Sequence, residues 1–238
     1  MHKTGPHGQH ISQRYDAELE DLRASVLKMG GMVEQQGRAA LESLVKGDEE
    51  LARSVAKSDK QVNEIELKIS DQCTDILARR QPTAGDLRLV IAIIRIVANL
   101  ERIGDEAAKI GRMAKKLVDG NERQSYHSEP RHLGEGVLEM LKGALDAFAR
   151  RDTDTAMEVI ARDLQIDEEF KALNRLLMTH MMEHPNRLKN MLRVNSCARA
   201  FERIGDHATN LCEEVIYLVA GRDVRHLSLA EIRERLQN

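Results

Sequence analysis

The sequence contains few of the residues that favour β-strands and tight turns. Among its 238 residues there is no Trp, and there are only three Phe, three Tyr and four Pro. Charged residues make up 32% of the chain and hydrophobic residues 42%. Because aromatic residues are enriched in strands, whereas long helices are rich in Ala, Glu, Lys, Leu and Arg, this composition predicts an all-α protein.

A strong net charge of either sign is also missing. The formal net charge is -3 and the pI is about 6.3. A protein that binds nucleic acid through its phosphates needs a basic surface, so we do not expect a nucleic-acid partner. The most apolar run, 89–100, contains Arg95 and is too short to span a bilayer.

Cysteines are scarce and scattered. Cys73, Cys197 and Cys212 are odd in number and lie within helical patterns, which is typical of small core residues in a reducing compartment. The first ten residues contain no apolar run of the kind that a secretory signal needs. Together these features predict a soluble, cytoplasmic protein.

A five-residue motif occurs twice in the chain. Glu-Arg-Ile-Gly-Asp spans 101–105 and again 202–206. Further matches between the halves, such as Asp48 with Asp152 and Asp59 with Asp163, have an offset of 104 positions. The chain is therefore an internal duplication with a repeat of about 100 residues. We predict two pseudo-symmetric three-helix bundles, residues 1–120 and residues 121–238.

Apolar residues at helical spacing, together with capping signals, predict six long helices and a short terminal one. In the first half we expect helices from near Tyr15 to Lys46, from the cap at Asp48 to near Arg80, and onward from a capping box of Thr83 and Asp86. In the second half we expect 131–150, a helix from the cap at Asp152 to about Met182, one from Pro185 onward, and a short one from Ser228. Connections this short make neighbouring helices antiparallel.

Two details of packing are predicted as well. Gly30 and Gly31 interrupt the first helix, either as a kink or as a point of close packing. The second helix has apolar residues at heptad intervals, which predict a seam against a neighbouring helix. These residues are Val55, Val62, Ile69 and Ile76.

Each copy of the motif places a Glu and an Asp four residues apart, on one face of a helix. Glu101 and Asp105 continue an apolar stripe of Val90, Ile94 and Val97, so we expect them to be partly buried. A buried carboxylate needs a counter-charge, which a metal ion supplies. The preceding helix of each half offers more oxygen atoms, and the full candidate set for a hard cation is Glu101, Asp105, Asp59 and Asn63 in the first half and Glu202, Asp206, Asp163 and Asp167 in the second.

Other interpretations of the acids remain open. Arg102 and Arg203 are placed to form ordinary ion pairs with them, in a metal-free helical scaffold. A metal-dependent enzyme on a carboxylate-lined bundle, for example a phosphatase, is the other alternative. A ferritin-like di-iron site is disfavoured, because Gly104 and Gly205 stand where it needs His. His207 has no counterpart in the first half, so we expect it at the surface. Since the sequence contains no evident catalytic constellation, we predict that the protein is not an enzyme.

At these residues the sequence resembles the PhoU family of phosphate-transport accessory proteins. The resemblance covers essentially the whole chain and is carried by 17–20, 29–36, 80–84, 86–90 and both copies of the motif. It implies two three-helix bundles and a negative regulator of the phosphate-starvation response. Such a regulator links the ATPase subunit of the phosphate ABC transporter to a sensor histidine kinase, and reaches the membrane only through these partners.

The resemblance also implies a cofactor. Some members of the family hold iron or zinc clusters on a motif that Glu101 with Asp105 and Glu202 with Asp206 match here. Iron or zinc is therefore expected ahead of manganese or magnesium. Long helices with apolar stripes left over further make a homodimer plausible.

One segment occurs only in the first half. Residues 80–88 have no equivalent before the last long helix. The segment is either a docking surface for a partner or a helix cap and helix start. As a docking surface it would use Arg80, Gln81, Asp86 and Arg88.

Overall fold

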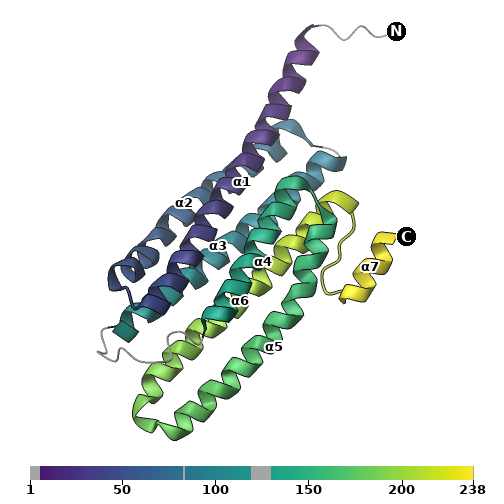
Figure 1. Cartoon of the computed structure of the whole chain (residues 1–238). Coiled ribbons are helices and arrows are strands. Elements are labelled where there is room, and N and C mark those ends of the chain that lie inside the picture. The colour runs from purple at the N-terminus through teal and green to yellow at the C-terminus, as the bar shows by residue number, and fades with distance from the viewer. Residues whose placement is uncertain (1–5, 83, 119–129, 238) are drawn as a thin grey trace.

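The computed structural model describes residues 6–82, 84–118 and 130–237, and within them the chain forms helices joined by short connections (Figure 1). The elements are α1 (Pro6–Lys46), α2 (Glu49–Arg80), α3 (Ala84–Val118), α4 (Arg131–Arg150), α5 (Thr153–Glu183), the 3-10 helix η1 (Pro185–Arg187), α6 (Leu188–Ala220) and α7 (Leu229–Gln237). The predicted all-α fold, with six long helices and a short C-terminal one, is confirmed. The expected boundary at residues 120 and 121 and Thr83 of the expected capping box lie outside the described residues.

The six long helices form two sets of three. Helices α1, α2 and α3 pack against one another, and α4, α5 and α6 do the same. The two sets join mainly through α3 and α6, with a smaller contact between α1 and α4 (Figure 1). The molecule is elongated because all the long helices lie along roughly the same axis.

One hydrophobic core runs through both sets of helices. The predicted seam of α2 is confirmed, since Val55, Val62, Ile69 and Ile76 are all buried. The predicted stripe of α3 is wrong at Ile94, which is exposed, whereas the adjacent Ile93 is buried. The reason is that α3 packs against α1, α2 and α6 at once, so its buried positions do not follow a single stripe.

The predicted helix caps are confirmed where the structure describes them. Asp48 accepts a hydrogen bond from the backbone N–H of Leu51 at 2.9 Å. Asp152 caps α5 in the same way through the N–H of Asp154 at 2.9 Å. Ser228 and Glu231 form the expected capping box, because the Ser228 N–H donates to Glu231 Oε2 at 2.7 Å.

Two predicted helix starts differ from the structure. Helix α1 begins at Pro6, not near Tyr15. Pro185 opens the 3-10 turn η1, and α6 itself begins at Leu188. Proline lacks an N–H and has a fixed φ, so it suits the first turn of a helix, and a 3-10 turn is a common way to enter one.

Gly30 marks a point of close packing within an unbroken α1. A Cβ atom at this position would lie 2.4 Å from Leu145 Cδ2 of α4, whereas Gly31 has open space around it. The close-packing interpretation is therefore correct for Gly30. It lets α1 and α4 approach each other where the two halves meet.

The remaining sequence expectations concern cysteines and membranes. All three cysteines are buried free thiols, as predicted. Across the described part of the chain, no helix has both the length and the apolar character that are needed to cross a membrane.

Candidate functional site

The glycine of each motif brings the motif next to an aspartate of the neighbouring helix. In the first half, a Cβ atom at Gly104 of α3 would lie 3.7 Å from Asp59 Oδ1 of α2. In the second half, a Cβ atom at Gly205 of α6 would lie 3.6 Å from Asp163 Oδ1 of α5. The structure therefore places Asp59 beside the first motif and Asp163 beside the second, as the sequence predicted.

A buried amide fixes this contact in the first half. Gln36 of α1 is 5% exposed, and its Nε2 donates to the carbonyl oxygens of Gly104 at 3.3 Å and Val55 at 3.4 Å. The amide thus ties α1 to α2 and α3 beside the motif. The sequence analysis missed Gln36, although a Gln among core positions of an amphipathic helix was a visible signal.

The candidate ligands of the first half, which we call the first acid cluster, are the acids Asp59, Glu101 and Asp105 and the amide Asn63. Burial and the nearby charge of Asp105 raise the pKa of Asp59. Burial, followed by the charge of Asp105, also raises the pKa of Glu101, and Glu66 contributes as a further acid. Asp59 Oδ1 and Asn63 Oδ1 are buried and accept no hydrogen bond within the described part of the chain. The cluster therefore carries negative charge and has two buried acceptor oxygens to which no described residue donates a hydrogen bond.

The second acid cluster consists of Asp163, Asp167, Glu202 and Asp206, and its carboxylates repel one another more strongly. Burial, with the charges of Asp206 and Asp167, raises the pKa of Asp163 to about 6. Burial, with the charge of Asp206, raises the pKa of Glu202. Asp206 has a raised pKa for the same reasons, namely lost hydration and the charge of Asp167. The two halves differ because Asp163 is more deeply buried than Asp59, and because Asn63 stands where the second half has the charged Asp167.

The donor types of both clusters fit an oxygen-ligated cation, since carboxylate and amide oxygens are the ligands that hard cations prefer. Their side chains nevertheless do not close on one point. Within the ranges that the structure describes, no group of three or more His, Cys, Asp or Glu side chains is arranged to hold a metal ion. Cation binding in either cluster would require these side chains to turn toward a common centre.

The arginines of the two motifs make different contacts. Arg102 lies 3.4 Å from Glu101 and 3.5 Å from Asp105, so it forms the local ion pairs that the scaffold interpretation expects. Arg203 instead donates from Nη1 to Glu106 Oε1 of α3 at 2.6 Å. The scaffold interpretation therefore describes the first motif and not the second.

His207 differs from its expected place at the surface. It is half-buried, and its Nδ1 lies 2.9 Å from Asn99 Oδ1 of α3. Burial lowers the pKa of the imidazole. The residue belongs to the contact between α3 and α6, because Asn210 of α6 also donates to Asn99, at 3.2 Å.

The candidate docking segment makes contacts inside the molecule. The guanidinium of Arg80 donates to Glu18 of α1 at 2.6 and 2.9 Å. Gln81 is the C-cap of α2 and has a left-handed backbone, with φ of 47°. Asp86 lies in the first turn of α3, and Arg88 packs beside Gly221 at the end of α6. Arg80 and Arg88 thus make contacts within the molecule, and the backbone of Gln81 caps a helix. The Gln81 side chain remains exposed.

Comparisons with known proteins give one consistent result. A family model described as the PhoU domain matches residues 26–114 and 131–215. The chain is 48% identical to the phosphate-specific transport system accessory protein PhoU homolog of Pseudomonas aeruginosa, over 96% of this chain and 95% of that protein. It is 43% identical to the PhoU accessory protein of Escherichia coli strain K12, over 96% of this chain and 94% of that protein.

Solved structures agree with the sequence comparisons. The crystal structure of PhoU from Pseudomonas aeruginosa matches with a TM-score of 0.85 and 47% identity, over 87% of this chain and 100% of that one. The phosphate transport system regulatory protein PhoU from Streptococcus pneumoniae matches with a TM-score of 0.81 and 29% identity, over 88% of this chain and 99% of that one. The match includes both halves of the duplication.

Proposed function

The chain belongs to the PhoU family, and from this membership we propose that it is a negative regulator of phosphate uptake and of the phosphate-starvation regulon. The observation that carries the proposal is similarity along nearly the whole length to accessory and regulatory proteins of phosphate transport. Those names describe accessory proteins, which supports a role without catalytic turnover.

In this role the protein is a cytoplasmic adaptor. It binds the ATPase subunit of the phosphate ABC transporter and the sensor histidine kinase of the regulon, and it approaches the membrane only through them. When phosphate is ample, its binding restrains uptake and keeps the kinase in its dephosphorylating state. Exposed apolar side chains on several helices support a homodimer as the form that docks.

A reporter for the phosphate regulon tests this role. In a strain that lacks its own regulator, expression of this chain should restore repression of the reporter in ample phosphate and leave induction in scarce phosphate intact. A reporter that stays fully induced, although the chain is present and folded, would contradict the proposed role.

We further propose that the two acid clusters bind metal ions, with iron or zinc ahead of manganese or magnesium. The residues that would hold them are Glu101, Asp105, Asp59 and Asn63 in the first half and Glu202, Asp206, Asp163 and Asp167 in the second. The raised pKa values support this, because they reflect carboxylates that have lost hydration on burial and lie near other acids. A bound cation would supply that charge, and the carboxylates would hold α5 against α6 and α2 against α3.

Metal analysis of the purified chain tests the second proposal. Replacement of both Glu202 and Asp206 by Ala should lower the metal content, because two of the four ligands of the second cluster are lost. The matched control is Glu168→Ala on α5, since Glu168 is exposed and pairs with Lys171 at 2.8 Å. Unchanged metal content in the double variant, with its helical content intact, would refute metal binding at this cluster.

A further inference from the structure

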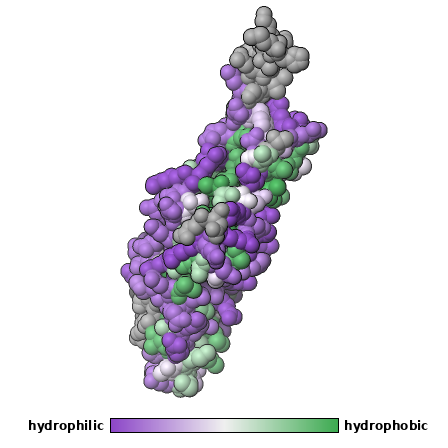
Figure 2. Space-filling model, turned by 90° about the vertical axis from the view of Figure 1, so that its right-hand side faces the viewer, coloured by the Kyte–Doolittle hydropathy of each residue, from purple (hydrophilic) through white to green (hydrophobic). Residues whose placement is uncertain are grey.

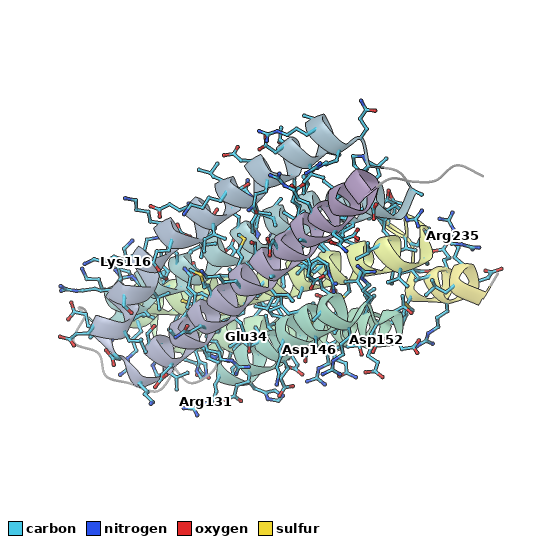
Figure 3. The ribbon with its side chains drawn as sticks, turned by 90° about the horizontal axis from the view of Figure 1, so that it is seen from above. Glu34, Lys116, Arg131, Asp146, Asp152 and Arg235 are labelled. Atoms are coloured by element: carbon cyan, nitrogen blue, oxygen red, sulfur yellow. The ribbon has the colours of Figure 1, made fainter. Side chains whose placement is uncertain are left out.

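A groove lies at the end of the molecule where α3 finishes and α6 begins. Its volume is about 550 Å³, and we call it the tip groove. It is lined by Met113 and Lys116 of α3 and by Leu188, Lys189, Leu192, Arg193 and Ser196 of α6. Lys116 and Arg235 of α7 lie toward opposite ends of the molecule (Figure 3).

The floor of the tip groove is apolar and remains open to solvent. Leu188 is 44% exposed and Leu192 is 49% exposed. These residues are four apart and share one face of α6, and Ser196 continues that face. The stripe from Leu188 to Ser196 is about 12 Å long, since a helix rises 1.5 Å per residue. Apolar and hydrophilic surface also alternate along the elongated face that Figure 2 shows.

The rim of the tip groove is basic. Lys116, Lys189 and Arg193 all line it, and none of the lining residues that the structure describes is acidic. This contrasts with the net charge of -3 of the whole chain. The tip groove is therefore a local basic site on a slightly acidic protein.

A contact inside the molecule holds the two walls together. Arg193 of α6 donates from Nη1 to the backbone oxygen of Lys116 at 2.7 Å, and also to Asn190 Oδ1 at 3.0 Å. The first of these bonds satisfies a carbonyl in the last turn of α3. Because it ties the end of α3 to α6, the tip groove exists before any partner arrives.

We propose that the tip groove binds an amphipathic helix of a partner protein, with apolar side chains against Leu188 and Leu192 and acidic side chains facing Lys116 and Lys189. An open apolar floor about two helical turns long matches the face of a helix with anchors at i, i+3, i+4 and i+7. The basic rim favours a partner helix with acidic side chains on both sides of its apolar stripe, because a helix with basic side chains there would be repelled.

This inference rests on the proposed adaptor role and assigns it a docking end. Asp86, in the segment predicted to dock a partner, and Lys116 both lie on α3, 30 positions apart in the sequence. They are therefore separated by about 45 Å along the helix. A partner in the tip groove would leave the segment at residues 80–88 free, so the two ends can hold different partners.

A peptide titration on the full chain tests the proposal. The probe is a fluorescent peptide of about 16 residues with leucine at i, i+3, i+4 and i+7 and glutamate on both sides of that stripe. Leu192→Asp, and separately a double variant of Lys116→Glu with Lys189→Glu, should each weaken binding by about tenfold or more. Leu164→Asp, at an exposed leucine of α5, and Lys68→Glu, at an exposed lysine of α2, are matched controls that should leave binding unchanged.

Each outcome decides the proposal. Binding that is lost in both tip variants and kept in both controls supports it, as does failure of a peptide with lysine in place of glutamate. No binding, or equal loss in the control variants, overturns it. Vesicles of anionic lipid that bind through the same residues while the peptide does not would assign the tip groove to a membrane. A change of oligomeric mass on Leu192→Asp, without peptide binding, would assign it to a second copy. Since the titration involves no phosphate response, its failure is separate from failure of the reporter test.

Discussion

Arg203 of the second motif reaches across the molecule to Glu106, the residue that directly follows the first motif. Its Nη1 donates to Glu106 Oε1 at 2.6 Å, and Glu106 also accepts from Lys109 at 2.9 Å. Glu106 is buried between α3 and α6, whereas its counterpart in the second half is His207. The duplicated motif thus has one member that joins the two halves and one member, with Arg102, that pairs with its own acids.

This asymmetry predicts different costs for the same change in the two motifs. Arg203→Ala should lower the free energy of unfolding by about 1 kcal/mol, because it leaves a buried carboxylate with one partner fewer. Arg102→Ala should cost less than about 0.5 kcal/mol, because the Arg102 side chain is exposed and its ion pairs are long, at 3.4 and 3.5 Å. Urea denaturation of both variants measures this, and equal costs would mean that the contact to Glu106 contributes nothing.

The two motif glycines should respond differently to alanine. At Gly205 a Cβ atom would meet its nearest neighbour at 3.6 Å, an ordinary contact, so Gly205→Ala should stabilise the fold by about 0.5–1 kcal/mol through helix propensity. At Gly104 the Cβ atom would lie 3.3 Å from Val62 Cγ1, so that gain should shrink or turn into a loss. Thermal and urea unfolding in the presence of a chelator measure the change in stability of the Gly104→Ala and Gly205→Ala variants. A larger gain at position 104 than at 205 would contradict the packing described.

Glu213 should make stability depend on pH near neutrality. Burial, with the charge of Glu214, raises the pKa of Glu213 from 4.5 to about 7, while Arg225 acts in the opposite direction. The folded state therefore binds the proton more tightly than the unfolded state, so stability should rise as the pH falls from 8 toward 5.

The matched variant for this prediction is Glu213→Gln. It should raise the free energy of unfolding at pH 8 by about 1 kcal/mol, less than the whole shift implies because the side chain is only half-buried. At pH 5 it should have little effect. A variant that is equally stabilising at both values would show that the Glu213 carboxylate is not the titrating group.

A substitution at Gln81 can distinguish a capping role from a docking role for this residue of the segment predicted to bind a partner. Gln81 caps α2 with φ of 47°, and Arg151 caps α4 with φ of 54°. Glycine adopts this conformation without strain, so Gln81→Gly and Arg151→Gly should each stabilise the fold, by about 0.5–1 kcal/mol. If the Gln81 side chain binds a partner, Gln81→Gly should weaken partner capture despite its greater stability, and Arg151→Gly should not. Equal capture by both variants would leave the Gln81 side chain with a capping role alone.

Local features of the sequence predicted much of this structure. Some features depend only on residue spacing within one helix, so they could be predicted without knowledge of the fold. They are the caps at Asp48 and Asp152 and the seam of α2. The duplication then paired Asp59 with Asp163, and the structure places both beside a motif glycine. Local signals were thus sufficient for these caps and this seam, whereas the starts of α1 and α6 were predicted wrongly.

Features that depend on how the helices pack against one another could not be predicted from local sequence. The place of Ile94 follows from the docking of α3 against several helices, and the partners of Arg203 and His207 follow from the contact between the halves. The charge of Glu66 acts on Glu101 of the first acid cluster. The second half has Phe170 at the equivalent position, so a comparison of the two halves could not reveal Glu66. The tip groove likewise exists only because α3 ends beside the start of α6.

The measurement that tests the adaptor account most directly is capture of the two proposed partners by the purified chain. The chain is immobilised and exposed to purified transporter ATPase subunit and to the purified cytoplasmic part of the sensor kinase, and the bound amount of each is quantified. Captures from extracts of cells grown in ample and in scarce phosphate then report whether binding follows phosphate status. The account predicts that both partners bind and that more is recovered in ample phosphate. Failure of both purified partners to bind the folded chain, with or without added iron or zinc, would contradict it.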